Sequence, residues 1–139
     1  MKLFDTTLGN LQSSLNIRLA KQTVLAGNLA NVDTPGFRPR ELDFDAAFKA
    51  SQAGNALSAG QPTMTHEGHL GVSAEQTSTA PEAFVKVSEK AEGGLDGNAV
   101  DLDRTMVELS RNALQYGAAA RAAGKKLAIL KYVASDGVG

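Results

Sequence analysis

The sequence predicts a mainly α-helical protein in which long N-terminal and C-terminal helices pair as a coiled coil. An irregular middle segment with a short helix and little β-structure joins them. Apolar residues recur at alternating spacings of four and three toward both ends of the 139-residue chain, which is the spacing of a coiled-coil seam. A Pro-Gly pair ends the first pattern, and no sustained periodicity follows it. We therefore expect a helix over 1–33, an irregular region over 34–97, and a second helix with a short tail over 98–139.

The N-terminal helix is predicted from an apolar pattern that runs from Phe4 to Val32. Arg18 and Gln22 interrupt it, and polar residues at seam positions weaken a coiled coil but help to fix its register. The seam contacts expected from this helix are Leu8, Leu11, Leu15, Leu25 and Leu29.

The end of this helix is set by the stretch "VDTPGF". Thr34 precedes Pro35, and a residue before proline is pushed out of the α region of backbone space. Pro35 and Gly36 also suit the two central positions of a type II turn. The helix is therefore expected to stop near Val32 or Asp33.

The middle region begins with "ELDFDAAFKA", which places Leu42, Phe44, Ala47 and Phe48 where a short amphipathic helix could bury them. Residues 51–62, "SQAGNALSAGQP", then predict a polar linker of small residues. Further along, the weak alternation in "AFVKVSEK" indicates one short strand.

The C-terminal helix shows the most regular pattern, an unbroken heptad seam that runs from Leu102 to Ala134. Asn98 is expected to act as its N-cap, with Asp101 three residues later as the acid of a capping box. The large seam residues expected to make helix contacts are Leu102, Met106, Leu109, Tyr116, Leu127 and Leu130.

Aromatic residues that could fill a core are scarce for a chain of this length, with five Phe, two Tyr and no Trp. The terminal helices can cover each other's seams, but the middle region supplies little to cover their outer faces. Ordering a backbone residue costs about 1–2 kcal/mol. We therefore expect the isolated chain to be loosely folded and to order fully on association.

Several functional classes are disfavoured by composition. A net charge of −1 without a long basic run disfavours nucleic-acid binding. No apolar run approaches the length of a transmembrane segment or of a cleaved signal. His66, Glu67 and His69 in "THEGHL" do not form the H-E-x-x-H pattern, and no third ligand lies close in sequence. We expect no cofactor, no metal ion and no catalytic residues, although a metal-dependent enzyme built on these three residues stays open as a distant alternative.

The stretch "LAGNLANVDTPGF" resembles the N-terminal signature of flagellar basal-body rod proteins. Asn28, Asn31, Thr34, Gly36 and Phe37 occupy its patterned positions, and Phe37 stands where many relatives carry Tyr. Together with Pro35, these residues form the expected assembly motif. The short length, "THEGHL" and "DGNAVDLDRTMVELSRNALQY" resemble the proximal-rod branch of the family.

The resemblance implies a structural subunit that assembles helically into the drive shaft carrying motor torque to the hook and filament. It implies location in the periplasmic rod of the basal body, reached by flagellar type III export without a cleaved signal. The implied partners are other copies of the chain, other rod proteins, and export-gate and rod-base adaptor proteins. It also implies that Asn28 and Asn31 cap backbone groups or bond to neighbours, and that residues 38–44 lead outward to adjacent subunits. A soluble coiled-coil adaptor that binds a helical partner is the alternative.

Overall fold

The computed structural model describes residues 6–58, 80–88 and 93–135. Three α-helices dominate these residues, and a 3₁₀ turn and two very short strands complete them, which confirms the mainly α-helical fold class. The elements are α1 (Thr6–Ala30), β1 (Arg40–Leu42), α2 (Phe44–Ser58), η1 (Pro81–Phe84), β2 (Val85–Val87) and α3 (Leu102–Ala134).

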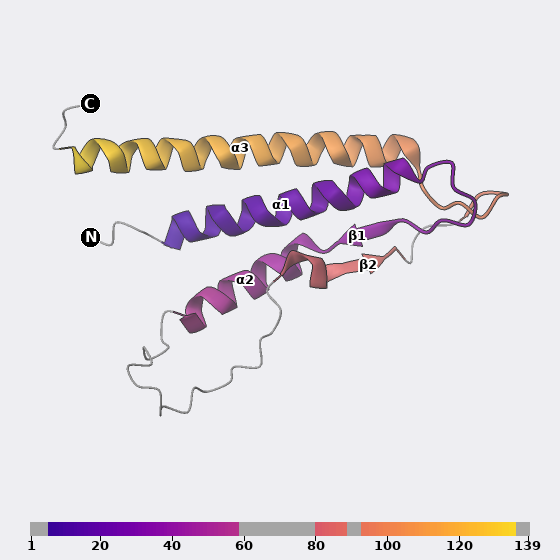
Figure 1. Ribbon diagram of the computed structural model, residues 1–139, viewed down its shortest axis with the longest axis horizontal. Helices are drawn as coiled ribbons and strands as arrows, with labels where there is room; N and C mark the ends of the chain where they lie inside the picture. The colour runs from indigo at the N-terminus through magenta and orange to yellow at the C-terminus, as the bar shows by residue number, and fades with distance from the viewer. Residues whose placement is uncertain (1–5, 59–79, 89–92, 136–139) are drawn as a thin grey trace, which may run out of the picture.

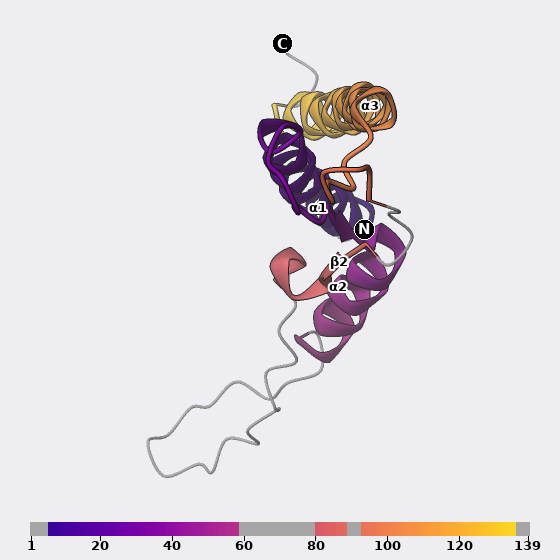
Figure 2. The same ribbon diagram turned by 90° about the vertical axis from the view of Figure 1, so that its right-hand side faces the viewer.

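Helix α1 lies in the middle of the molecule, between two other layers. One side packs along α3, which runs antiparallel to it, and the other side faces α2 and the two strands (Figures 1 and 2). Helix α3 has 33 residues and α1 has 25. Since each helical residue adds about 1.5 Å to the length of the helix, α3 is the longer of the two. Its C-terminal turns therefore extend past the described start of α1 (Figure 1).

The two strands form a small antiparallel sheet in which Arg40 pairs with Val87 and Leu42 with Val85. The sequence indicates the second strand but not the first, because Arg40, Glu41 and Leu42 show no alternation of apolar and polar residues. The chain supplies its partner strand directly after the Pro-Gly turn, so the segment after the turn runs back alongside α1 instead of leading outward.

The apolar core lies between α1 and the layer that holds α2 and the sheet. Ile17, Leu42 and Ala47 are buried there, and Phe44 and Phe48 stack beside them with ring centroids 5.8 Å apart. The four residues expected to anchor a short helix after the turn are therefore all in this cluster. The partly buried residues that pack against it are Ala20, Phe44, Phe48, Phe84 and Val85.

Helix boundaries differ from the sequence expectations at three places. Helix α1 ends at Ala30, and the next residues continue as tightened turns in which Val32 N donates to Leu29 O at 3.2 Å. Helix α2 continues to Ser58, through much of the expected linker, because that stretch contains no proline before residue 62.

The start of α3 is the third difference, because Asp101 and not Asn98 is its N-cap. Asp101 has an extended backbone, and its carboxylate accepts a hydrogen bond from Arg104 N at 3.0 Å. An N-cap accepts from the second or third helical amide, so the helix begins at Leu102.

None of the described helices has both the length and the apolar character needed to cross a bilayer.

Ile17 is the most completely buried large side chain of the core, at 2% exposure. Because the loss of buried methyl groups leaves a cavity, Ile17→Val should lower the free energy of unfolding by about 1 kcal/mol and Ile17→Ala by about 2–4 kcal/mol. Urea titrations followed by circular dichroism would measure both. Leu19→Ala is the matched control, because Leu19 is 57% exposed on the same helix, and should change stability by less than about 0.5 kcal/mol. Equal losses at both positions would show that the core is not where the structure places it.

Candidate assembly site

Three segments meet where α1 ends: the turn after α1, the entry to β1, and the loop that precedes α3. The turn spans Thr34 to Phe37, and Phe37 N donates to Thr34 O at 3.2 Å. Gly36 has a φ of 70°, the left-handed value that the third position of a type II turn requires. The predicted turn type is therefore confirmed, and it reverses the chain so that β1 lies against α1.

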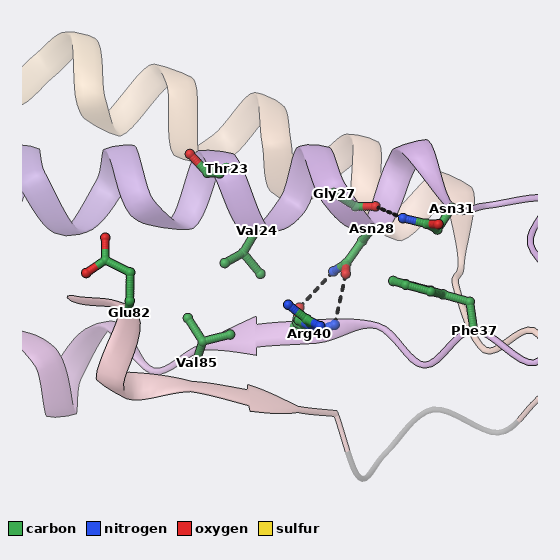
Figure 3. Close-up of a pocket in the computed structure, with 9 residues that line it drawn as sticks. All are labelled: Thr23, Val24, Gly27, Asn28, Asn31, Phe37, Arg40, Glu82 and Val85. Carbon is green, nitrogen blue, oxygen red and sulfur yellow. Dashed lines mark hydrogen bonds between the residues drawn. The ribbon is translucent and has the colours of Figure 1, made fainter. Parts of the chain in front are cut away.

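Asn28 holds the returning chain to α1. Its side-chain Nδ2 donates to Arg40 O at 2.7 Å, and Arg40 N donates to Asn28 Oδ1 at 2.9 Å. One carboxamide thus satisfies both backbone groups of a β1 residue, as the two dashed lines in Figure 3 show. Asn28 is 4% exposed. A buried amide that makes two hydrogen bonds at this place fixes the distance between α1 and the sheet.

Asn31 acts within its own helix end. Its Nδ2 donates to Gly27 O at 2.8 Å (Figure 3), and its Oδ1 accepts from Thr34 Oγ1 at 3.2 Å. The first bond satisfies a carbonyl of the last turn of α1, which has no partner further along the helix. The second ties the turn to that helix end. Asn28 and Asn31 thus both make hydrogen bonds within the chain.

Asn98 does not occupy the N-cap position that the sequence predicts for it. Instead of starting α3, it is buried against the end of α1, where its Nδ2 lies 3.1 Å from Asn31 O, 2.6 Å from Val32 O and 2.9 Å from Thr34 O. Its Oδ1 accepts from Val100 N at 2.8 Å. Asn98 therefore caps the C-terminal end of α1 from a position more than sixty residues away in sequence, which no local pattern could have revealed.

The loop around Asn98 is also bonded to the turn through its backbone. Gly36 N donates to Asp96 O at 3.1 Å, and Ala99 N donates to Phe37 O at 3.0 Å. Gly97 has a φ of 74° and lies against the Gly36 backbone, where an added Cβ would be 3.5 Å from Gly36 Cα. Two left-handed glycines thus let two backbones lie side by side, and this contact connects the end of α1 to the approach to α3.

The contact between α1 and α3 has a polar centre. Asn112, at 3% exposure, donates from Nδ2 to Arg18 O at 2.9 Å and to Gln22 Oε1 at 2.8 Å. Arg18 Nη1 donates to Gln115 Oε1 at 2.6 Å, and its guanidinium lies 4.5 Å from the centroid of the Phe44 ring. Burial lowers the pKa of Arg18 below its usual value. The polar interruption of the N-terminal seam therefore marks the face of α1 that contacts α3.

The face of α3 that packs on α1 is turned relative to the apolar seam read from the sequence. Thr105 and Asn112 are buried, whereas Met106, one residue from Thr105, is 52% exposed. The hydrogen bonds of Asn112 favour this orientation over the more apolar one. The spacing of apolar residues alone does not reveal those hydrogen bonds.

The predicted seam residues consequently have different environments within one chain. On α1, Leu25 is buried, and Leu8, Leu11, Leu15 and Leu29 are half-buried. On α3, Leu109 and Leu130 are half-buried. The remaining predicted contacts on α3 are exposed, namely Leu102, Met106, Tyr116 and Leu127.

A shallow groove of about 420 Å³ runs between α1 and the sheet, next to the Asn28 bridge (Figure 3). Val24 and Val85 point toward each other across it, and the Phe37 ring lies at the end near Asn31 (Figure 3). Its walls are largely apolar, which suits a packing contact better than bond-making chemistry. The lining residues are Thr23, Val24, Gly27, Asn28, Asn31, Phe37, Arg40, Glu82 and Val85.

His66, Glu67 and His69 lie outside the described residues. In the part of the chain that is described, no three His, Cys, Asp or Glu side chains come together in a way that could hold a metal ion.

The part of this junction that α1 and the turn supply matches a known family. The flagella basal body rod protein family model matches residues 8–38, which include all six residues of the assembly motif. The flagellar basal body rod protein FlgB of Escherichia coli (strain K12) is 40% identical over 114 residues, which cover 81% of this chain and 80% of the relative. The chain belongs to the FlgB family of flagellar basal body rod proteins. It is a structural subunit of the flagellar rod, in the basal body.

Other FlgB proteins extend the match. The protein of Salmonella typhimurium is 34% identical over 114 residues, which cover 81% of this chain and 80% of the relative. The protein of Bacillus subtilis is 28% identical over 137 residues, or 99% of both chains. Asn98 lies outside the segment matched by the family model, although the structure joins it to that segment directly.

Two glycines allow the turn to be tested with one kind of substitution. An added Cβ meets nothing within 4 Å at either Gly36 or Gly27, so only the backbone conformations differ. Gly36→Ala must keep a left-handed φ and should cost about 1–2 kcal/mol. Gly27→Ala lies in a helix and should stabilise the protein by up to about 1 kcal/mol. Opposite shifts of the melting temperature are expected, and shifts of the same sign would contradict the assigned turn.

Replacement of Asn98 tests the cap on α1. Asn98→Ala should lower the free energy of unfolding by about 1–3 kcal/mol, because three part-buried carbonyls lose their donor. Asn98→Asp is the sharper variant, since it keeps an acceptor for Val100 N but places a carboxylate against the same carbonyls, and it should cost at least as much. Thermal melts give the totals, and hydrogen exchange should show faster exchange at the end of α1. Wild-type stability of Asn98→Asp would exclude the capping role.

Proposed function

We propose that this chain is a subunit of the proximal rod that assembles helically with its own copies and with other rod proteins. The resulting drive shaft carries torque from the motor to the hook and filament. The main observation in support is the set of large apolar side chains that α3 leaves exposed along its length. The exposed large apolar residues of α3 are Leu102, Met106, Val107, Leu114, Tyr116, Leu127, Ile129, Tyr132 and Val133.

The energy available from covering this surface is large relative to the core within one chain. Burying a large apolar side chain contributes about 1.5–3 kcal/mol. Four apolar side chains are buried among the described residues, namely Ile17, Leu25, Leu42 and Ala47. Association would therefore add more buried large side chains than one chain provides alone, which supports a subunit that gains much of its order on assembly.

A small core also suits the route to the rod that we propose, which is flagellar type III export without a cleaved signal, followed by assembly in the periplasm. A chain with few buried apolar groups needs little work to be unfolded for passage through a narrow channel. The further partners on this route are export-gate and rod-base adaptor proteins. We propose no catalytic activity and no cofactor.

The assembly motif has a defined task in this proposal. Asn28, Asn31 and the turn from Thr34 to Phe37 hold α1, β1 and the loop before α3 in one rigid junction. The junction fixes the angle at which α3 leaves the body of the subunit, and a repeated angle is what a regular helical assembly requires. The exposed seam residues Leu102, Met106, Tyr116 and Leu127 are then contacts between subunits.

The decisive experiment is a concentration series measured by circular dichroism and by sedimentation velocity. Helicity should rise as defined oligomers or filaments form. Met106→Lys should weaken association by about tenfold or more, because it places a charge among the exposed apolar side chains of α3. Ser110→Lys is the control, at another exposed position of the same helix. A dilute chain that is already fully helical and stays monomeric would reject self-assembly and favour a soluble adaptor that binds a helical partner.

A further inference from the structure

The small net charge of the chain hides a strong separation of charge along the sequence. Residues 33–108 contain thirteen acidic and six basic residues. Residues 1–32 contain three basic residues and one acid, and residues 109–139 contain five basic residues and one acid. The terminal segments are thus positive and the region between them is negative.

The fold converts this separation into two oppositely charged ends. The C-terminal part of α3 lies at one end of the molecule together with the start of α1, and the junction before α3 lies at the other (Figure 1). Residues 6–32 and 109–135, which are all described, contain no acidic side chain. We call Arg121, Lys125, Lys126 and Lys131 the basic end; Arg121, Lys125 and Lys131 are exposed.

The opposite end carries exposed acids. Asp33, Asp96, Asp101 and Asp103 surround the junction, and we call them the acidic end. Asp96 and Asp101 use carboxylate oxygens to accept backbone hydrogen bonds, which leaves their negative charge in place. Exposed cations near this end are Arg38, Arg40 and Arg104. Arg104 lies 3.3 Å from Glu108 and 3.9 Å from Glu41, so its charge is directed to those two carboxylates.

We propose that the basic end of one copy docks on the acidic end of a second copy, so that subunits associate head to tail. The contact joins two different surfaces, and repetition of such a contact produces an open helical array when the rotation does not close a ring. Leu127, Ile129 and Tyr132 are exposed among the cations of the basic end, which adds apolar area to the charge attraction. This inference rests on the self-assembly proposed above and names the surfaces that would carry it.

A second copy explains more of the surface than an anionic membrane does. A helix with basic and apolar side chains can bind anionic lipids, and that would account for the basic end. It would leave the acidic end without a partner. A copy of the same chain supplies the complement of both ends in equal number.

The test compares two double variants of the full chain that have the same net charge. Lys125→Glu with Lys131→Glu reverses two charges of the basic end and should weaken self-association by about tenfold or more. Lys49→Glu with Lys86→Glu makes the same change at exposed positions outside both ends and should leave association nearly unchanged. Adding Asp33→Lys with Asp103→Lys to the first variant should restore much of the loss. Self-association of the wild type should also weaken with salt between about 50 and 500 mM NaCl, because screening shortens the range of exposed charges.

Analytical ultracentrifugation of all four proteins gives the answer, and circular dichroism confirms that each keeps its helices. Equal weakening in both double variants would mean that net charge acts and not the two ends, and the inference would fail. Association that ignores salt and all the variants would overturn the head-to-tail contact while leaving self-assembly intact. A wild type that never associates would overturn both proposals. Salt-sensitive co-sedimentation with phosphatidylcholine–phosphatidylglycerol vesicles, with no effect of the variants on self-association, would assign the basic end to a lipid surface instead.

Discussion

The side chain of Asn98 on the carbonyl groups at the end of α1 is the interaction on which the arrangement of the two long helices depends. A helix end leaves carbonyls without partners, and here a residue of the loop before α3 supplies the donors. Because Asp101 caps α3 three residues later, one short loop caps the C-terminal end of α1 and the N-terminal end of α3. At their shared end, the two helices are thus held together by hydrogen bonds to backbone groups more than by apolar contact.

Helix α1 presents two chemically different faces to its neighbours. The side toward α2 and the sheet is apolar and includes Ile17, whereas the side toward α3 has Arg18 and Gln22 bonded to Asn112 and Gln115. Apolar packing tolerates small shifts in register, but hydrogen bonds between named groups do not. The α1–α3 pair consequently buries less apolar surface than a uniformly leucine-lined pair would. Its register is fixed more strictly, because shifted helices would lose these hydrogen bonds.

The sequence was sufficient for the features that local chemistry determines. The two long helices, the type II turn at Gly36 and the apolar anchor of α2 each follow from spacing, from proline and glycine geometry, or from amphipathic pattern, and the structure contains all three. It was insufficient where the deciding partner is remote. Asn98 looks like an N-cap because an Asn before a helix usually is one, and its real acceptors lie more than sixty residues earlier. The rotation of α3 depends in the same way on the hydrogen bonds of Asn112.

The order of the elements along the chain has a kinetic consequence. Helix α1, strand β1 and helix α2 follow one another within residues 6–58 and already contain Ile17, Leu42 and Ala47, so most of the core can form from contacts of short sequence separation. The bonds between α1 and α3 span ninety residues or more, and long loops are slow to close. The C-terminal helix is therefore the last element to dock. In a chain that emerges N-terminus first, α1, β1 and α2 can pack together while α3 is still free. Helix α3 can then dock on α1 of its own chain or on a neighbouring subunit.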